Sequence, residues 1–460
     1  MHILLVSYDN SSYTHWFPHG LGYLAGVLRA NDHNVTIYNQ DIHHYPESHL
    51  TAFLDDQQFD MIGIGTIGGY YQYRKLLAIA KAINASKHRP FFVIGGHGPS
   101  PEPEFFLRRT GADVACIGEA EETVLDLIAA VEQRRNLRTV AGIAYREGDS
   151  VIINPRRDPV QDIDTIPHPA YDLFPMDHYR LIRFVHASAT DFVFPLLSGR
   201  GCKFKCNFCY RLEDGFRARL PEAILDEVAL LQRNYGISYI YFFDELLMSS
   251  KERTIELCEA FIRSKIKFRW SCNGRLNFAT PEVLRLMKQA GCVFINYGIE
   301  SVDNRVLKNM NKALTRKIIE RGITATLKSG ISPGFNMIFG NIGDTRESLQ
   351  QAVDFLVKYD DGAQMRTIRP VTPYPGSPLY YYALKHGLLK DVEEFYEVKH
   401  LNSDLVSVNF TNLTDDEFHE ALMEANITLL KNFYAKKCDI MIENTRHLYM
   451  DKDTSFRGYR

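Results

Sequence analysis

The sequence predicts an α/β protein, with a doubly wound parallel sheet followed by a partial (β/α)6 TIM-like barrel and a small helical C-terminal region. Two observations carry this prediction. Short apolar runs alternate with segments of helical periodicity over the first third of the chain. From Phe194 onward a strand–loop–helix unit recurs roughly every 40 residues. Both patterns are typical of parallel sheets, which bind their ligands at the carboxyl ends of the strands.

Composition and charge exclude several classes of partner. The chain has 460 residues, of which 45% are hydrophobic and 24% charged, and its formal net charge is -3. This balance offers no bulk attraction for nucleic acid or for an anionic membrane. No run of about 18 apolar residues occurs, and Met1–Val6 leads into a strand-like stretch without a basic leader. We therefore expect a cytoplasmic protein with no membrane span and no nucleic-acid partner; the small-molecule substrate that we expect follows from the family resemblance described below.

The first third of the chain supplies the elements of the doubly wound sheet. We expect strands at residues 2–7, 35–38, 61–65 and 91–94, and helices at about 20–30 and 71–85. The loops after the third and fourth of these strands are rich in glycine, which lets the backbone approach a large ligand. Tight turns alone would also account for the glycines. Gly63–Gly68 has the spacing G-x-G-x-x-G, but its first two glycines lie within the expected strand at 61–65 and not in a loop that opens a helix, and this disfavours a dinucleotide.

The same region resembles a known cofactor-binding domain. The segments PHGLGYLA (18–25), GGH (95–97), GAD (111–113) and GEAE (118–121) are similar to the Rossmann-like cobalamin-binding domain that precedes many radical S-adenosylmethionine enzymes. The resemblance implies cobalamin over the carboxyl edge of the sheet, although the domain could also have kept the fold without the cofactor. The loops that would surround the cofactor hold Thr66, Gly95, Gly96, His97 and Glu119.

Histidine ligation of cobalt is not expected. Methionine-synthase-type domains use D-x-H-x-x-G, whereas Asp41–Pro46 has proline in place of the glycine and follows the second strand instead of the first. We therefore interpret His43 as a surface residue.

The rest of the chain divides into a connector, the barrel and a C-terminal region. Residues 141–190 are rich in proline and weakly periodic, so we expect them to link a domain at 1–140 to a barrel at 191–390. In the C-terminal region, 391–460, Thr414–Glu417 should cap an amphipathic helix that runs to about Lys437 and covers the open side of the barrel. The expected barrel strands lie at 194–198, 237–243, 267–272, 292–299, 334–339 and 365–370, with helices near 221–235, 251–265, 281–290, 315–328 and 345–358.

Three of the eight cysteines are clustered directly after the first barrel strand. Cys202, Cys206 and Cys209 have the spacing C-x3-C-x2-C. Three thiolates can hold an iron–sulfur cluster and leave one iron open to a small molecule. Structural zinc is the alternative, but no fourth Cys or His lies nearby at zinc-finger spacing. The other five cysteines are interpreted as small buried side chains.

This loop closely resembles the signature of the radical S-adenosylmethionine superfamily. The resemblance implies a 4Fe-4S cluster whose open iron binds S-adenosylmethionine, and a 5'-deoxyadenosyl radical formed by one-electron cleavage. It also implies an external one-electron donor of flavodoxin or ferredoxin type. Phe208, between the last two cysteines, is assigned by the resemblance to the cofactor site.

Later strand ends match further segments of the same family. By the resemblance, Asp244 and Glu245 would receive the methionine amine, and Arg275 would pair with the methionine carboxylate. Glu300 and Ser301 stand at the ribose-contacting G-x-E-S, and Gly340 and Asn341 at the adenine segment, where Ile342 and Asp344 replace the usual proline and glutamate. Tyr374, within the segment PYPGSPL (373–379), would line the substrate pocket.

These observations predict a radical S-adenosylmethionine enzyme that carries out cobalamin-dependent methylation of an unactivated carbon. One alternative is the same radical chemistry without methyl transfer, in a dehydratase, cyclase or rearrangement. A second alternative is a cobalamin- or metal-binding sensor without turnover.

Overall fold

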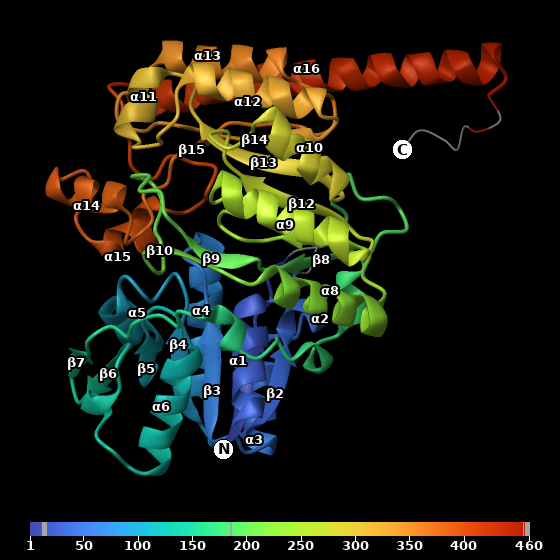
Figure 1. Cartoon of the computed structure of the whole chain (residues 1–460). Helices are drawn as coiled ribbons and strands as arrows, with labels where there is room; N and C mark the ends of the chain where they lie inside the picture. Colours follow the sequence, from blue (N-terminus) through green and yellow to red (C-terminus); the bar gives the residue numbers. More distant parts are fainter. Residues whose placement is uncertain (12–15, 185, 454, 456–460) are drawn as a thin grey trace.

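The protein consists of two α/β units with the carboxyl edges of their sheets turned toward each other (Figure 1). The computed structural model describes residues 1–11, 16–184, 186–453 and 455. Residues 454 and 456–460 of the expected C-terminal region therefore lie outside the described residues. In the described part of the chain, no helix combines the length and apolar character that crossing a membrane requires.

The first unit contains a seven-stranded sheet in the order β2-β1-β3-β4-β5-β6-β7. The first five strands are parallel, whereas β6 and β7 are antiparallel additions at one edge. This confirms the expected doubly wound sheet and extends it to Ile153, into the range expected to be a connector. The strands are β1 (His2–Ser7), β2 (Asn34–Asn39), β3 (Met61–Gly65), β4 (Phe91–Gly95), β5 (Val114–Cys116), β6 (Ile143–Glu147) and β7 (Ser150–Ile153).

Helices cover both faces of this sheet. Ile3 and Leu5 of β1 pack into the core below α1 and α6, while Leu4 and Val6 point to the opposite core below α3, α4 and α5. Alternating side chains of one apolar strand thus supply both cores, as in parallel sheets that are buried on two faces. The helices are α1 (His19–Ala30), α2 (Gln40–His43), α3 (Glu47–Asp56), α4 (Tyr70–Asn84), α5 (Pro103–Thr110) and α6 (Glu121–Glu132).

The connector lies against α1. Ala170 donates its backbone N–H to the carbonyl of Gly22 at 3.0 Å. A Cβ on Gly26 would stand 2.3 Å from the carbonyl oxygen of His168, so only glycine permits this approach. Short helical elements lie just before the connector and along it: η1 (Leu137–Thr139), η2 (Ile163–Thr165), η3 (Tyr171–Leu173) and α7 (Met176–Tyr179).

The second unit is the expected six-stranded partial barrel. Its parallel strands run in the order β15-β14-β13-β12-β11-β8. The last strand is shorter than predicted, because buried Arg366 holds the preceding turn by pairing with Asp360 and Asp361 and by donating to the carbonyl of Pro333. The strands are β8 (Val193–Leu196), β11 (Tyr239–Phe242), β12 (Arg269–Gly274), β13 (Cys292–Glu300), β14 (Ser332–Phe339) and β15 (Arg369–Pro370).

Helices line the outside of the barrel and form the C-terminal region. The capping box at Thr414 and Glu417 begins α16 as predicted, but this helix ends at Met450 instead of about Lys437. Its first half packs on α13, and Asn426 bonds both backbone groups of Ile368 beside the edge strand β15. The remaining helices are α8 (Pro221–Tyr235), α9 (Lys251–Ser264), α10 (Pro281–Gln289), α11 (Asn304–Asn309), α12 (Arg316–Lys328), α13 (Arg346–Lys358), α14 (Pro378–Lys385), α15 (Val392–Glu394) and the π-helical turn η4 (Phe395–Lys399), with α16 spanning Asp415–Met450.

Candidate active site

The cysteine loop lies between the two sheets. It is carried by an antiparallel hairpin of β9 (Gly199–Cys202) and β10 (Gly215–Ala218), which sits above the carboxyl edge of the first sheet in Figure 1. Gly201 has φ +83°, and a Cβ there would stand 2.4 Å from the carbonyl oxygen of Gly215. A side chain at Gly201 would therefore break the hairpin that presents the first cysteine.

The three thiols share one loop, and a buried arginine stands beside them. Arg275 Nη1 lies 4.0 Å from Cys206 Sγ. Burial raises the pKa of Cys202, so binding of a metal there must displace a proton. Among the described residues, no three His, Cys, Asp or Glu side chains converge as ligands of a single ion. Cysteines of a 4Fe-4S cluster each hold a different iron, so convergence on one point is not required of them.

Asn207, inside the cysteine loop, ties it to the last barrel loops. Its side-chain amide forms two reciprocal hydrogen bonds of 3.0 Å with that of Asn341. Its backbone N–H donates to the carbonyl of Met310 at 2.9 Å, and its carbonyl accepts from Leu379 at 2.8 Å. Asn207 belongs to no motif that the sequence singled out, and only its spacing between two cysteines could have drawn attention to it.

Arg275 supports the cysteine loop in this structure. Its guanidinium is buried, donates through Nη2 to the carbonyl of Lys312, and stacks over the ring of Phe204 at 3.5 Å. The predicted pairing with a methionine carboxylate would require the guanidinium to share these contacts. The geometry favours a role for Arg275 in positioning the loop.

Asp244 and Glu245, the predicted acceptors for an amine, differ in their surroundings. Asp244 is buried, and its carboxylate accepts the backbone N–H of Ser198 at 2.6 Å and also the Ser198 hydroxyl. Burial raises the pKa of Asp244 to about 6. Glu245 is exposed at the same strand end. Asp244 therefore joins the ends of β8 and β11, and Glu245 is the carboxylate that faces outward.

Glu300 and Phe208 lie beside a lysine that the sequence did not predict, Lys312, and Ser301 follows Glu300 in the chain. Glu300 follows an irregularity in β13 and has φ +69°, an uncommon conformation for a residue with a side chain. Its carboxylate pairs with Lys312 Nζ at 3.0 Å, and both side chains are less than a tenth exposed. The same Nζ stands 5.3 Å from the centre of the Phe208 ring. Ser301 is buried and accepts the N–H of Asp303 at 3.2 Å.

Gly340 and Asn341 belong to a tight turn that Asp344 organises. Asp344 accepts the backbone N–H groups of Gly340 and Asn341 at 3.0 and 2.9 Å, and the hydroxyl of Ser348 at 2.7 Å. Burial raises the pKa of Asp344 to about 6. Gly340 has φ +98° and lies against Phe418 of α16. Aspartate thus holds this turn although glutamate is usual there, and Thr345 is the residue that caps α13.

Tyr374 bridges the two units. Its ring packs over Gly68 of the β3–α4 loop, with Cδ1 3.4 Å from the position that a glycine Cβ would take. It also makes an edge contact of 5.3 Å with His400. The adjoining turn at Gly376, with φ +88°, packs on Tyr210 of the cysteine loop. Tyr374 therefore lies at the junction between both predicted cofactor regions.

The carboxyl edge of the first sheet is formed mainly by backbone. The Thr66 N–H donates to the carbonyl of Gly95 at 2.9 Å, and a Cβ on Gly96 would stand 2.5 Å from the carbonyl oxygen of Thr66. His97 is exposed, 6.0 Å from the ring of Tyr210. The close approach of the Gly96 and Thr66 loops therefore depends on a position without a side chain.

Glu119 has a different environment from the other predicted cobalamin contacts. Its carboxylate accepts from Arg200 at 3.1 Å and from both terminal nitrogens of Arg217. Both arginines lie on the β9–β10 hairpin, so Glu119 joins the two units. His43, by contrast, is exposed and stacks on Tyr45, which agrees with a surface histidine.

Comparison with known proteins decides the family. Residues 8–128 match the B12 binding domain, and residues 196–356 match the Radical SAM superfamily. An uncharacterized methyltransferase of Pyrococcus horikoshii is 30% identical over 403 residues, which cover 85% of each chain. The chain belongs to the radical SAM superfamily.

Further relatives place this radical SAM protein in the branch with a B12-binding domain. The anaerobic magnesium-protoporphyrin IX monomethyl ester cyclase of Rubrivivax gelatinosus is 27% identical over 377 residues, covering 79% of this chain and 66% of the cyclase. The fold matches that of TsrM, a radical S-adenosylmethionine methyltransferase from Kitasatospora setae, solved with cobalamin and a 4Fe-4S cluster. That match has a TM-score of 0.70 at 17% identity and covers 84% of this chain and 78% of TsrM.

The residues present fit the cofactors of these two domains. Three thiols in one loop are the donor set of a cluster with an open iron. At the edge of the first sheet, Gly96 lets two backbone segments approach so closely that a Cβ there would stand 2.5 Å from the carbonyl oxygen of Thr66. The radical SAM domain takes S-adenosylmethionine with a 4Fe-4S cluster, and the B12-binding domain takes cobalamin.

Proposed function

We propose that this enzyme transfers a methyl group to an unactivated carbon of a small-molecule substrate. The observation that carries the proposal is the meeting of the cysteine loop and the glycine-lined edge of the B12-binding domain at Tyr210, His97 and Tyr374. When bound, the cluster supplies one electron for cleavage of S-adenosylmethionine into methionine and a 5'-deoxyadenosyl radical, and cobalamin carries the methyl group. The source of the radical and the methyl donor would then lie in one protein, beside the same substrate.

The residues of the barrel edge bind and orient S-adenosylmethionine in this proposal. Glu245 accepts the methionine ammonium, because it is the outward-facing carboxylate, while Asp244 fixes the strand end through Ser198. The pair of Glu300 and Lys312 fixes the ribose-facing segment with Ser301. The turn of Gly340 and Asn341 presents backbone groups to the adenine, and Tyr374 lines the substrate side.

In this proposal, the residues of the first domain contribute mainly the shape of the surface that would bind cobalamin. Thr66, Gly95, Gly96 and His97 would hold bound cobalamin, the first three through their backbone. Glu119 fixes the hairpin of the cysteine loop against the first domain through Arg200 and Arg217. An external one-electron donor of flavodoxin or ferredoxin type completes the cycle, because none of these side chains is a reductant.

Replacement of the cluster ligands tests the proposal. Cys202→Ala/Cys206→Ala/Cys209→Ala should abolish the formation of 5'-deoxyadenosine and remove the bound iron. Cys438→Ala, which changes an exposed cysteine far along α16, is the matched control and should retain both. Persistent cleavage in the triple variant would contradict the cluster assignment, whereas absence of cleavage in the iron-loaded wild type would favour a sensor.

The relationship to a cyclase favours one alternative, radical chemistry without methyl transfer. Assays with S-adenosylmethionine labelled in its methyl group distinguish methyl transfer from radical chemistry without it. We expect label in the product together with 5'-deoxyadenosine, and cobalamin in the reconstituted protein. Product without label would assign a cyclase, dehydratase or rearrangement.

A further inference from the structure

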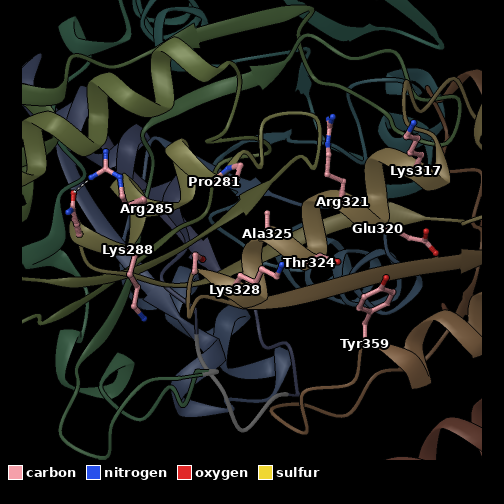
Figure 2. Close-up of a pocket in the computed structure, with 12 residues that line it drawn as sticks. Pro281, Arg285, Lys288, Lys317, Glu320, Arg321, Thr324, Ala325, Lys328 and Tyr359 are labelled. Atoms are coloured by element: carbon pink, nitrogen blue, oxygen red, sulfur yellow. Dashed lines mark hydrogen bonds between the residues drawn. The ribbon is translucent and has the colours of Figure 1, made fainter.

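A basic groove runs along the outer surface of the barrel between α10 and α12 (Figure 2). Its volume is about 860 Å³. Five exposed cations line it, with Pro281, Ala325 and Tyr359 among the uncharged lining residues. The cations, which define the basic groove, are Arg285, Lys288, Lys317, Arg321 and Lys328.

The positive charge of the basic groove is not neutralised. Glu320 is the one carboxylate among its lining residues, and it pairs with Arg316 at 3.3 Å. Lys288 donates to the carbonyl of Gly330 and Arg285 to Gln289, both neutral acceptors. Within the described residues, none of the five cations forms an ion pair. Scattered surface cations are ordinary, but five in one hollow of a chain with net charge -3 create a local positive field.

The groove begins next to the cysteine loop. Phe278, close before Pro281, lies 6.4 Å from the ring of Phe204 and 5.3 Å from Lys203 Nζ. Asn311 donates to the carbonyl of Lys205 at 2.8 Å, a few residues before α12 starts. The loops that hold the cysteine loop therefore lead directly into the two helices that line the groove.

We propose that the basic groove docks an acidic one-electron donor protein of flavodoxin or ferredoxin type. The inference rests on the proposed function, which consumes one electron for each S-adenosylmethionine cleaved. In the docked complex the donor is oxidised by one electron and the cluster is reduced by one, with no bond made or broken. Electron transfer weakens steeply with distance, so a docking surface has to adjoin the loop that carries the cluster.

Charge complementarity selects the partner. Carboxylates on the donor would meet Lys317 and Arg321 in the first turns of α12, with Arg285 of α10 across from them (Figure 2). Nucleic acid is usually bound along a longer basic stripe of a basic domain.

Charge reversal in the holoenzyme tests the docking surface. Lys317→Glu/Arg321→Glu should raise the Kd for oxidised flavodoxin by about tenfold or more at low ionic strength. In the wild type, carbodiimide should crosslink flavodoxin carboxylates to Lys288, Lys317 or Lys328. Formation of 5'-deoxyadenosine should fall to a similar extent with reduced flavodoxin and stay unchanged with dithionite. Lys317→Gln/Arg321→Gln should give an intermediate loss.

A matched control reverses two charges elsewhere. Lys81→Glu/Arg135→Glu changes exposed cations at the far ends of α4 and α6 and should leave binding and both rates unchanged. Wild-type affinity in the groove variant, or crosslinks confined to another surface, would overturn the proposal. So would groove-dependent binding of single-stranded RNA or of anionic phosphatidylserine vesicles without binding of flavodoxin. Failure of the proposed function would be recognised separately. In that case dithionite would give no 5'-deoxyadenosine with the wild type, whereas the binding of flavodoxin could still be measured.

Discussion

The two carboxyl edges that face each other in this protein are built in different ways. At the barrel edge, buried or half-buried polar side chains bind one another: Asn207 with Asn341, and Glu300 with Lys312. At the edge of the B12-binding domain, backbone and glycine form the surface, and the carboxylates of Glu119 and Glu121 bind arginines of the other unit. The barrel edge is therefore preorganised by side-chain pairs, and the first edge by the absence of side chains.

Because the two edges are built differently, mutations at the barrel edge and mutations at the first edge should have different effects. A change at the barrel edge leaves a buried polar group without its partner, which is costly in a low-dielectric interior. A change at the first edge adds atoms where a ligand or backbone has to fit. Three predictions test the contrast, from the largest expected effect to the smallest.

Lys312→Met should produce the largest loss. It leaves the Glu300 carboxylate buried without a partner, which should cost about 3–5 kcal/mol of the free energy of unfolding and abolish binding of S-adenosylmethionine. Urea unfolding and calorimetric titration measure the two effects. Lys312→Met/Glu300→Gln removes both charges and should recover most of the stability. Equal stability of the single and double variants would show that the pair is not energetically coupled.

Asp344 should make stability depend on pH. Burial raises its pKa in the folded protein to about 6, above the ordinary value of a carboxyl group, so its contribution to stability is full below that ordinary value and is lost as pH rises through about 6. The full difference is on the order of 3 kcal/mol, and about half of it falls between about pH 5 and 7.5. Asp344→Asn keeps an acceptor for the turn and should flatten this dependence in denaturant titrations. An unchanged slope would contradict the role of Asp344.

Gly96→Ala should have the smallest effect on stability and a selective effect on binding. The added Cβ meets the carbonyl oxygen of Thr66 at 2.5 Å in a backbone with φ +95°, which should cost about 1–3 kcal/mol. Cobalamin binding should weaken while the iron content stays unchanged. Gly65→Ala, at the same edge but with open space around its Cβ position, is the control. Equal losses in both variants would mean that the first edge does not depend on backbone approach.

Much of the fold could be predicted from the sequence because it depends on local patterns. Apolar strands alternating with amphipathic helices are sufficient to indicate two parallel sheets, and Thr280 and Thr414 mark helix starts through their own hydrogen bonds. Two element boundaries were predicted wrongly. The strand expected at 365–370 is shortened by the ion pairs of Arg366 with Asp360 and Asp361 and by its hydrogen bond to the carbonyl of Pro333. α16 runs past Lys437 to Met450 as a mostly exposed helix, beyond the apolar face from which its end was predicted.

The sequence by itself determined the two α/β units and the spacing of the three cysteines, and it predicted the strand ends where cofactors should bind. Spacing along the chain encodes these features directly. Only the tertiary structure decided which of the expected side chains face outward. It assigned Arg275 to the cysteine loop, Asp244 to Ser198 and Glu119 to the opposite domain, and it introduced Lys312 and the basic groove. These assignments depend on partners far apart in the chain, because a buried charge is stable only beside a partner that folding brings to it.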